Sequence, residues 1–486
     1  MEFIGERPQV DLTYSDVFLV PSRSSITSRL DVDLTPPDGT PARTPLVASN
    51  MNSVTGPRMA ATMARRGGLA VLAQDVPLQQ LDSAIRWVKA QPVLWDTPIV
   101  FAETATAADA LRMVPALPGV GVVVVRDPDA ALDSGNVRGV VTGERLGAAP
   151  EDAPLGTLVA GPAPAIDAED VTDARHAFDL VVETGEELLL VKDKHGVVVG
   201  TASARSTLRS SLYPAAVDAG GRLAVAAAVG INGDPAEKAK ALAAAGVDVL
   251  VLDTAHGHQR GMMQAIRNVA ALNLGLPIVA GNIVTADAVH DLVTSGATIL
   301  KVGVGPGAMC TTRMMTAVGR PQFSAVLETA EAARDMGAHV WADGGVRYPR
   351  DVALALAAGA ASVMIGSWFA GTIESPGELL RDATGRVYKE SWGMASTKAV
   401  QARFGRLNAY DRARKELFAE GISSSKIYLD PLRPSVEDLI DMITSGVRSS
   451  FTYAGAHTVT EFRERARVGL QSAAGYEEGK ALPVSW

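Results

Sequence analysis

From about Leu223 onward the chain repeats one unit, in which a short apolar run ends in Gly, Asp or Ser and an Ala-rich helical stretch follows. Continuous apolar strands separated by helices are typical of a parallel sheet that helices cover on both faces. Such a sheet either stays open or closes into a barrel. The strand-like runs lie at 223–230, 247–253, 276–281, 297–303, 338–345 and 361–367, with helical patterns at 235–246, 285–296 and 348–359 between them.

These six runs are too few to close a barrel, but two more lie upstream at 44–49 and 68–74, with a helical pattern at 57–67 between them. Two plus six gives the eight strands of an α/β fold, the (β/α)8 TIM barrel. An open doubly wound sheet is the alternative on pattern alone. In a barrel the functional residues stand at the carboxyl ends of the strands, so candidate site residues are expected there.

Residues from about 92 to 210 interrupt this series between the second and third strands. Pro-rich stretches replace the Ala-rich helices, and segment 120–146 is echoed by segment 186–208 as strand, turn, strand and helix start. A paired module inserted in one loop explains the change in composition and the internal repeat. A barrel tolerates such an insertion because the two ends of a loop lie close together. The predicted domains are 1–91 (first part of the barrel), 92–210 (the insert) and 211–486 (the rest of the barrel, with a catalytic loop and a flap).

Composition restricts the function classes. The net charge of −9 disfavours a general nucleic-acid binder, because phosphate backbones attract Lys and Arg. The single cysteine excludes an intrachain disulfide and a Cys-based zinc cluster. The chain begins with no signal-peptide pattern, and no apolar run reaches the ~18 residues of a membrane span. We therefore expect a soluble cytoplasmic enzyme that binds neither nucleic acid nor a membrane.

The most informative stretch is GVGPGAMCTTR at 303–313, directly after the sixth predicted strand. Its glycines and proline make a rigid turn that leads to the only cysteine, Cys310. A lone Cys is usually a small buried hydrophobe, but this one stands on a polar loop at the predicted catalytic face. Exposure and a nearby cation such as Arg313 would lower the thiol pKa, so we predict a nucleophile. Gly303 and Gly305 do not form a dinucleotide fingerprint, because no helix opens after them.

Other strand ends carry glycines and polar groups. Glycines let backbone N–H groups approach an anion, so the ends of the seventh and eighth strands predict a phosphate site, although tight turns alone would also select glycine. Asp343 precedes two of these glycines and could bind the hydroxyls of a ribose; its alternative role is a helix N-cap. Asp253 and His256 are expected to face a second ligand, and His256 receives no catalytic role. The predicted phosphate residues are Gly344, Gly345, Gly366 and Ser367.

A long charged extension follows the last strand, from Glu374 to Trp486. Segments 391–400 and 410–431 have mixed charge and little apolar periodicity. We interpret the extension as a mobile flap over the active site. The alternative is a peripheral or oligomeric appendage.

Taken together, these motifs resemble the IMP dehydrogenase/GMP reductase family over nearly the whole chain, and they follow the family's order. The insert resembles the family's pair of CBS motifs (a Bateman domain), so the resemblance implies ATP- or GTP-type effectors there. It also implies a homotetramer or octamer. The matching segments are TYSDVFLVP (13–21), SNMNSVT (49–55), DTAHGH (253–258), VGVGPGAMCTTR (302–313), VGRPQ (318–322), ADGGVR (342–347), MIGSWFAGT (364–372) and WGMAS (392–396).

The resemblance implies a role for each matched residue. Cys310 would attack C2 of the purine of a nucleoside monophosphate, with Thr312 and Glu420 handling protons. The nicotinamide side would be lined by Asp253, Asn282 and Gly303. Backbone carbonyls of Gly305, Gly307 and Cys310 would hold potassium. The implied substrate contacts are Ser49, Met51, Asp343, Gly345, Gly366, Ser367, Gly393 and Met394.

Five positions depart from the family's pattern. Ala308 stands where the family usually has Ser, which removes a phosphate contact, and Asn52 stands where it has Asp. Ser391 replaces a flap tyrosine. In the two repeats of the insert, Arg145 and Ser206 stand where an Asp usually binds a nucleotide ribose. We therefore expect nucleotide binding in the insert without that ribose contact.

Two features of the sequence separate the family's two activities. Dehydrogenases hydrolyse the purine adduct with an adjacent Arg-Tyr pair in the flap, but here Arg412 is followed by Ala413. Thr316 stands where reductases carry Thr and dehydrogenases commonly Ala. Both features favour GMP reductase with NADPH, although reductases are usually short chains without CBS domains. The alternatives are IMP dehydrogenase with NAD and a catalytically weak nucleotide-sensing relative; intact Cys310, Thr312 and Glu420 argue against the latter.

Overall fold

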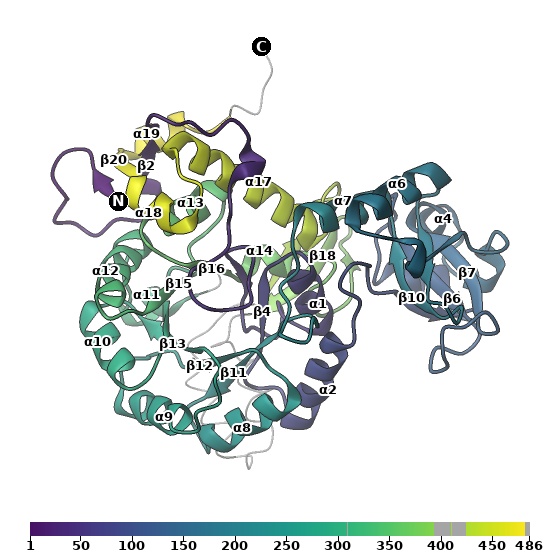
Figure 1. Ribbon diagram of the computed structural model, residues 1–486, viewed down its shortest axis with the longest axis horizontal. Coiled ribbons are helices and arrows are strands. Elements are labelled where there is room, and N and C mark those ends of the chain that lie inside the picture. The colour runs from purple at the N-terminus through teal and green to yellow at the C-terminus, as the bar shows by residue number, and fades with distance from the viewer. Residues whose placement is uncertain (309, 393–409, 411–423, 482–486) are drawn as a thin grey trace.

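The computed structural model describes residues 1–308, 310–392, 410 and 424–481. Its centre is a closed barrel of eight parallel strands, which confirms the predicted barrel and excludes the open sheet (Figure 1). The strands lie where the apolar runs predicted them. In barrel order they are β11 (Ala226–Gly230), β12 (Val249–Asp253), β13 (Ile278–Ile283), β14 (Ile299–Val302), β15 (His339–Asp343), β16 (Ser362–Ile365), β3 (Leu46–Ala48) and β4 (Leu69–Leu72).

Helices surround the barrel, as Figure 1 shows, and bury the outer faces of its strands. Both faces of each strand are covered, so the strands read as continuous apolar runs. Two short helices, α11 (Thr312–Thr316) and α14 (Ser367–Ala370), lie in the loops after β14 and β16. The outer helices are α1 (Pro57–Arg65), α2 (Leu78–Lys89), α8 (Pro235–Ala245), α9 (Arg260–Ala270), α10 (Ala286–Thr294), α12 (Gln322–Asp335) and α13 (Pro349–Ala357).

The segment between β4 and β11 forms two three-stranded sheets of the same topology. In each sheet the first two strands are parallel and the last two are antiparallel, and a helix follows the last strand. A small apolar core of Val123, Val125, Leu190 and Val198 joins the sheets. The elements are β5 (Val100–Ala102), α3 (Ala107–Leu111), β6 (Gly121–Val125), β7 (Val137–Thr142), α4 (Gly143–Ala148) and α5 (Leu155–Leu158), then β8 (Ala165–Asp167), α6 (Ala174–Thr184), β9 (Leu189–Lys192), β10 (Val198–Ala202) and α7 (Ala204–Leu212).

The chain enters and leaves this double-sheet segment at neighbouring points. Asp96 and Thr201 exchange both backbone hydrogen bonds at 3.0 Å. Beyond them, α7 packs beside α17 (Val436–Ala454), as Figure 1 shows. Arg209 of α7 pairs with three carboxylates of α17 at 2.6 to 3.1 Å: Glu437, Asp438 and Asp441.

The extension after β16 corrects one expectation, because much of it is packed structure and not a flap. Val436, Ile440, Ile443, Val447 and Phe451 are buried at helical spacing along α17. This apolar stripe packs against the barrel. The flap was expected from the polar stretch that precedes α17. Residues 393–409 and 411–423 of that stretch lie outside the described part.

Smaller elements complete the molecule. β17 (Leu380–Arg381), β18 (Val387–Trp392) and β19 (Ser424–Tyr428) form one sheet. A second sheet joins the two ends of the chain: β1 (Glu2–Phe3), β20 (Arg467–Leu470) and β2 (Val17–Val20). α18 (Val459–Arg465) and α19 (Ala473–Glu478) flank β20. Within the described residues, no helix is both long and apolar enough to cross a membrane.

Candidate active site

A cavity of about 760 Å3 opens at the carboxyl end of the barrel. The carboxyl ends of β3, β4, β12, β13, β14, β15 and β16, with loops that follow them, form much of its wall, as expected for a barrel enzyme. Three predicted site residues, Gly393, Met394 and Glu420, lie outside the described residues. All the other residues given a role line this cavity: Ser49, Met51, Asp253, Asn282, Gly303, Gly305, Gly307, Cys310, Thr312, Asp343, Gly345, Gly366 and Ser367. His256, expected to face a second ligand together with Asp253, is exposed and does not belong to the lining.

Cys310 is exposed in the loop between β14 and α11. Its thiol lies 3.2 Å from the hydroxyl oxygen of Thr312, to which it donates a hydrogen bond. Its backbone N–H donates to the carbonyl of Gly307 at 3.0 Å, which closes the turn. The stem of Arg313 lies across Gly305. The sulfur therefore faces both the cavity and the hydroxyl group predicted to handle protons.

Gly303 allows two strand ends to approach each other closely. Its φ of 150° is rare for residues with a side chain, and a Cβ at this position would lie 2.1 Å from the carbonyl oxygen of Asp343. No side chain fits in that space. The loop that carries Cys310 is thereby held against the end of β15.

A buried, unpaired hydroxyl group, that of Ser49, lies beside one of the predicted phosphate residues, Gly366. Ser49 Oγ has no hydrogen-bond partner among the described residues, and a Cβ on Gly366 would lie 3.2 Å from it. Gly345, two residues after Asp343, has a φ of 82°, a conformation that favours glycine. Tyr14 Oη and Gln322 Oε1 are likewise buried and unpaired, and both residues line the same cavity. Buried polar atoms are normally satisfied, so their concentration here suits a polar ligand.

Asp343 and Asp253 meet at one buried ammonium group. Lys301 Nζ lies 2.9 Å from Asp343 Oδ2 and 2.8 Å from Asp253 Oδ1. Asn282 Nδ2 donates to Asp343 Oδ2 at 2.9 Å and to the carbonyl of Gly303 at 2.6 Å. Burial alone would lower the pKa of Lys301, but the two carboxylates outweigh it and raise that pKa above its ordinary value.

Lys301 was not among the expected site residues, although the sequence carries a signal for it. Lys301 is the one charged residue in the predicted apolar run 297–303. A charge inside a strand buried on both faces requires a partner. Gln74, whose amide donates to Asp253 at 3.4 Å, was not expected either. The N-cap alternative for Asp343 is wrong, because the next helix, α13, is capped by Tyr348.

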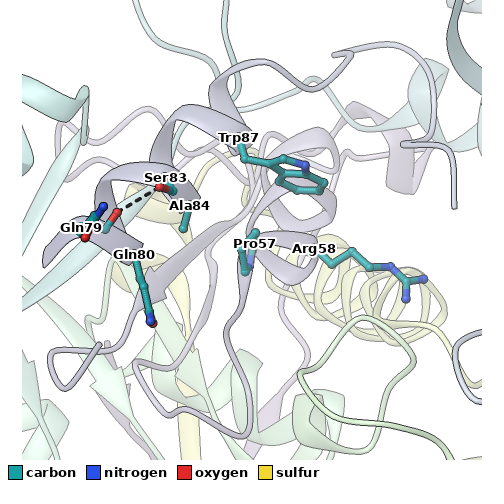
Figure 2. A pocket seen from close by; sticks show the side chains of 7 residues that line it. All are labelled: Pro57, Arg58, Gln79, Gln80, Ser83, Ala84 and Trp87. Carbon is teal, nitrogen blue, oxygen red and sulfur yellow. Dashed lines mark hydrogen bonds between the residues drawn. The ribbon is translucent and has the colours of Figure 1, made fainter. Parts of the chain in front are cut away.

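A second hollow, of about 660 Å3, lies on the outside of the barrel between α1 and α2 (Figure 2). Trp87 and Arg58 border it, and the hydroxyl of Ser83 donates to the carbonyl of Gln79 at 3.0 Å. Arg58 is the only charged residue in its lining, and the one hydroxyl group there, that of Ser83, is bonded to its own helix with no general base in the lining to activate it. We therefore place the candidate active site in the cavity at the end of the barrel.

The side chains of the described residues form no cluster of three His, Cys, Asp or Glu that could hold a metal ion. The predicted potassium site would use backbone carbonyls of Gly305, Gly307 and Cys310 instead. The carbonyl of Gly307 already accepts the Cys310 N–H and has a second lone pair to offer.

Comparison with known proteins agrees with this geometry. A profile of the IMP dehydrogenase / GMP reductase domain matches residues 11–481. The chain is 52% identical, over 489 residues and 100% of both chains, to the GMP reductases of Mycobacterium tuberculosis and Mycobacterium bovis. It is 35% identical over 491 residues to the inosine-5'-monophosphate dehydrogenase of Staphylococcus aureus, covering 96% of this chain and 94% of that one.

A solved structure is also similar along the whole chain. It is the crystal structure of a cysteine-to-alanine variant of GMP reductase from Trypanosoma brucei in complex with guanosine 5'-monophosphate. The TM-score is 0.67 at 30% sequence identity, and the match covers 98% of this chain and 99% of that one.

Proposed function

The chain belongs to the IMP dehydrogenase/GMP reductase family, and on that premise we propose that it is a GMP reductase that converts GMP to IMP and ammonia with NADPH. One observation carries this choice. Identity to the GMP reductases is 52% along the entire chain, whereas identity to the dehydrogenase of Staphylococcus aureus is 35% and to that of Chlorobaculum tepidum is 33%.

In the proposed reaction Cys310 supplies the nucleophile. The sulfur adds to C2 of the guanine ring, the bond from C2 to the exocyclic nitrogen breaks, and ammonia leaves. Thr312, hydrogen-bonded to the thiol, and Glu420 deliver the proton that the leaving nitrogen requires. NADPH supplies the hydride that replaces sulfur at C2, and the thiolate is released with IMP.

Two groups of residues orient the reactants. We assign the phosphate of GMP to Ser49, Gly345, Gly366 and Ser367, and the ribose to Asp343. Met51, Gly393 and Met394 are assigned to the purine. The residues that fit the nicotinamide are Asp253, Asn282 and Gly303, because they line the cavity beside Asp343. Potassium at the carbonyls of Gly305, Gly307 and Cys310 would brace the turn that presents the thiol.

Product identity tests the proposal. Purified protein is incubated with GMP and NADPH while loss of the reduced-nicotinamide absorbance and release of ammonia are followed together. One ammonia should appear for each NADPH consumed. Formation of xanthosine monophosphate from IMP and NAD at a comparable or greater rate would contradict it and favour a dehydrogenase.

We also propose that residues 92–210 are a tandem CBS module that binds ATP- or GTP-type nucleotides and regulates the barrel, and that the protein works in the cytoplasm as a homotetramer or octamer. The duplicated sheet topology supports a paired module. Ser206, one of the two departures from the ribose-binding pattern, accepts the Ser203 N–H at 3.0 Å in the capping box of α7. Its hydroxyl group thus serves the helix start, which agrees with the expected loss of the usual ribose contact at this position.

The neighbouring ends of the insert give a clean deletion. Joining Asp96 to Thr201 through a short Gly-containing turn removes both sheets but keeps Arg209 and its ion pairs with α17. A Trp95→Gln substitution prevents exposure of an apolar ring. The variant should retain turnover and lose any response to ATP or GTP. A folded but inactive variant, or one that still responds, would contradict the proposed division.

A further inference from the structure

Two carboxylates that we assign to different ligands depend on the same cation. Asp343 is assigned to the ribose of GMP and Asp253 to the nicotinamide side. Lys301 lies near the end of β14, one of the two strands between β12 and β15 in the barrel order, and forms ion pairs with Asp343 at 2.9 Å and Asp253 at 2.8 Å. Asn282 Oδ1 accepts a further hydrogen bond from the same ammonium. All four side chains line the cavity.

The burial of Lys301 fixes the position of its ammonium group between the two carboxylates. Only 3% of its side chain is exposed, whereas the carboxylates are 15% and 20% exposed. A Cβ at Gly281, on the neighbouring strand, would lie 2.7 Å from Lys301 Cβ, so the stem is fixed by close packing. A buried ammonium that is fixed at its stem and shared by two carboxylates sets the orientation of both. Each carboxylate still has exposed surface to offer a ligand.

We propose that Lys301 is a positioning residue that orients the GMP-binding and the nicotinamide-binding carboxylates together, so that both ligands depend on it although it touches neither. This inference rests on the proposed function. It implies that replacing Lys301 weakens the binding of both GMP and NADPH. Replacing Asp343 should weaken mainly the binding of GMP, and replacing Asp253 mainly the binding of NADPH.

The alternative is that Lys301 only stabilises the barrel. The chain offers a matched control for that role. Lys89, at the end of α2, is also buried between two aspartates, Asp218 at 2.9 Å and Asp248 at 2.6 Å. Asp248 directly precedes β12, so this group lies at the end of the barrel opposite the cavity.

The experiment compares Lys301→Met, Lys301→Arg and Lys89→Met with the wild type, using the full chain. Dissociation constants are measured for GMP by titration calorimetry and for NADPH by its fluorescence, and thermal unfolding is followed in parallel. Lys301→Met should weaken each ligand by at least roughly tenfold. Lys301→Arg should recover part of both losses because it keeps the charge. Lys89→Met should lower the melting temperature and change both affinities less than about twofold.

A double variant separates positioning from charge imbalance. Lys301→Met combined with Asp253→Asn removes one positive and one negative charge, so the net charge of the group is unchanged and folding is favoured. GMP binding should stay weak, because Asp343 still lacks its cation. Recovery of wild-type GMP affinity would overturn the inference. So would a folded Lys301→Met variant that binds either ligand as the wild type does. A wild-type protein that binds neither ligand would overturn the proposed function itself, and the inference with it.

Discussion

The two ends of β12 carry the same arrangement and use it differently. At its amino end Lys89 joins Asp218 and Asp248; at its carboxyl end Lys301 joins Asp253 and Asp343. The carboxylates at the amino end are also engaged by the backbone: Asp248 accepts the Val225 N–H at 2.7 Å and Asp218 accepts the Arg222 N–H at 2.9 Å. Those at the carboxyl end face the cavity. The group whose carboxylates also accept backbone N–H groups is therefore expected to serve stability, and the group whose partly exposed carboxylates are held by side chains and face the cavity is expected to serve binding.

The amino-end group also has a topological task. Lys89 ends the last helix before the insert, and Asp218 lies after the insert, just ahead of β11. Their ion pair joins the two parts of the barrel that the insert separates in sequence. Burial alone would raise the pKa of Asp218, but hydrogen bonds from the Arg222 N–H and the Lys89 ammonium lower it to about 2. Burial raises the pKa of Asp248.

The largest effect should come from removing the nucleophile at the cavity end. Cys310→Ala should lower kcat by roughly 10⁴-fold or more, because no other group can form the adduct. The exposed thiol contributes little to packing, so the melting temperature and the dissociation constant for GMP should stay near wild-type values. Turnover within tenfold of wild type would contradict the assigned role.

The next largest effect should come from the opposite end, and it should concern stability alone. Lys89→Met leaves two largely buried carboxylates without their shared cation, which costs about 3 kcal/mol in free energy of unfolding at pH 7. Urea denaturation measures the loss, and steady-state kinetics should show an unchanged KM for GMP. A raised KM with unchanged stability would show that the two ends are not specialised as described.

A methyl group at Gly303 tests how tightly the cavity end is built. In Gly303→Ala the new Cβ would meet the Asp343 carbonyl, which displaces the catalytic loop and lowers kcat/KM by about 100-fold, the cost of a misplacement near 1 Å. Gly275→Ala is the control, because Gly275 also has a positive φ but open space around it. Similar losses of activity in both variants would mean that backbone strain, and not the close approach, is responsible.

A third buried lysine, Lys389, shows what burial does to a lysine whose hydrogen-bond acceptors are carbonyl groups and not carboxylates. Lys389 is 2% exposed and donates to the carbonyls of Ile373 and Ser375 instead of to an acid. Burial, reinforced by Arg58 and opposed by Glu374, lowers the pKa of Lys389 to about 7. The folded state therefore binds fewer protons than the unfolded state between pH 7 and the ordinary lysine value of 10.5, and stability contributed here rises with pH in that window.

The smallest predicted effect follows from that shift. Between pH 7 and 8.5 the wild type should gain about 1.5 kcal/mol in free energy of unfolding relative to Lys389→Met, measured by urea denaturation at each pH. Lys194→Met, at an exposed lysine, should show no such change. A difference that shrinks as pH rises would contradict the assigned direction.

The barrel could be predicted from the sequence because strands buried on both faces leave continuous apolar runs, as at 247–253 and 276–281. The candidate site followed, since strand ends converge in a barrel. The Lys301 group could not be derived from spacing, because its members stand on separate strands and meet only through barrel register. α17 was not predicted for a different reason. Its apolar stripe follows the polar segments 391–400 and 410–431, whose mixed charge led to the interpretation of the whole extension as a flap.

The pairing of β3 with β16 has a consequence for how the molecule is made. The barrel cannot close until residue 365 has been synthesised, and β1 cannot pair until β20, at 467–470, has been synthesised. The insert is different, because each of its sheets pairs only strands that are close in sequence, and its two ends meet at Asp96 and Thr201. During synthesis on the ribosome the insert can therefore fold before most of the strands that pair with β3 and β4 have been made. The nascent chain then carries a folded insert before the barrel can close.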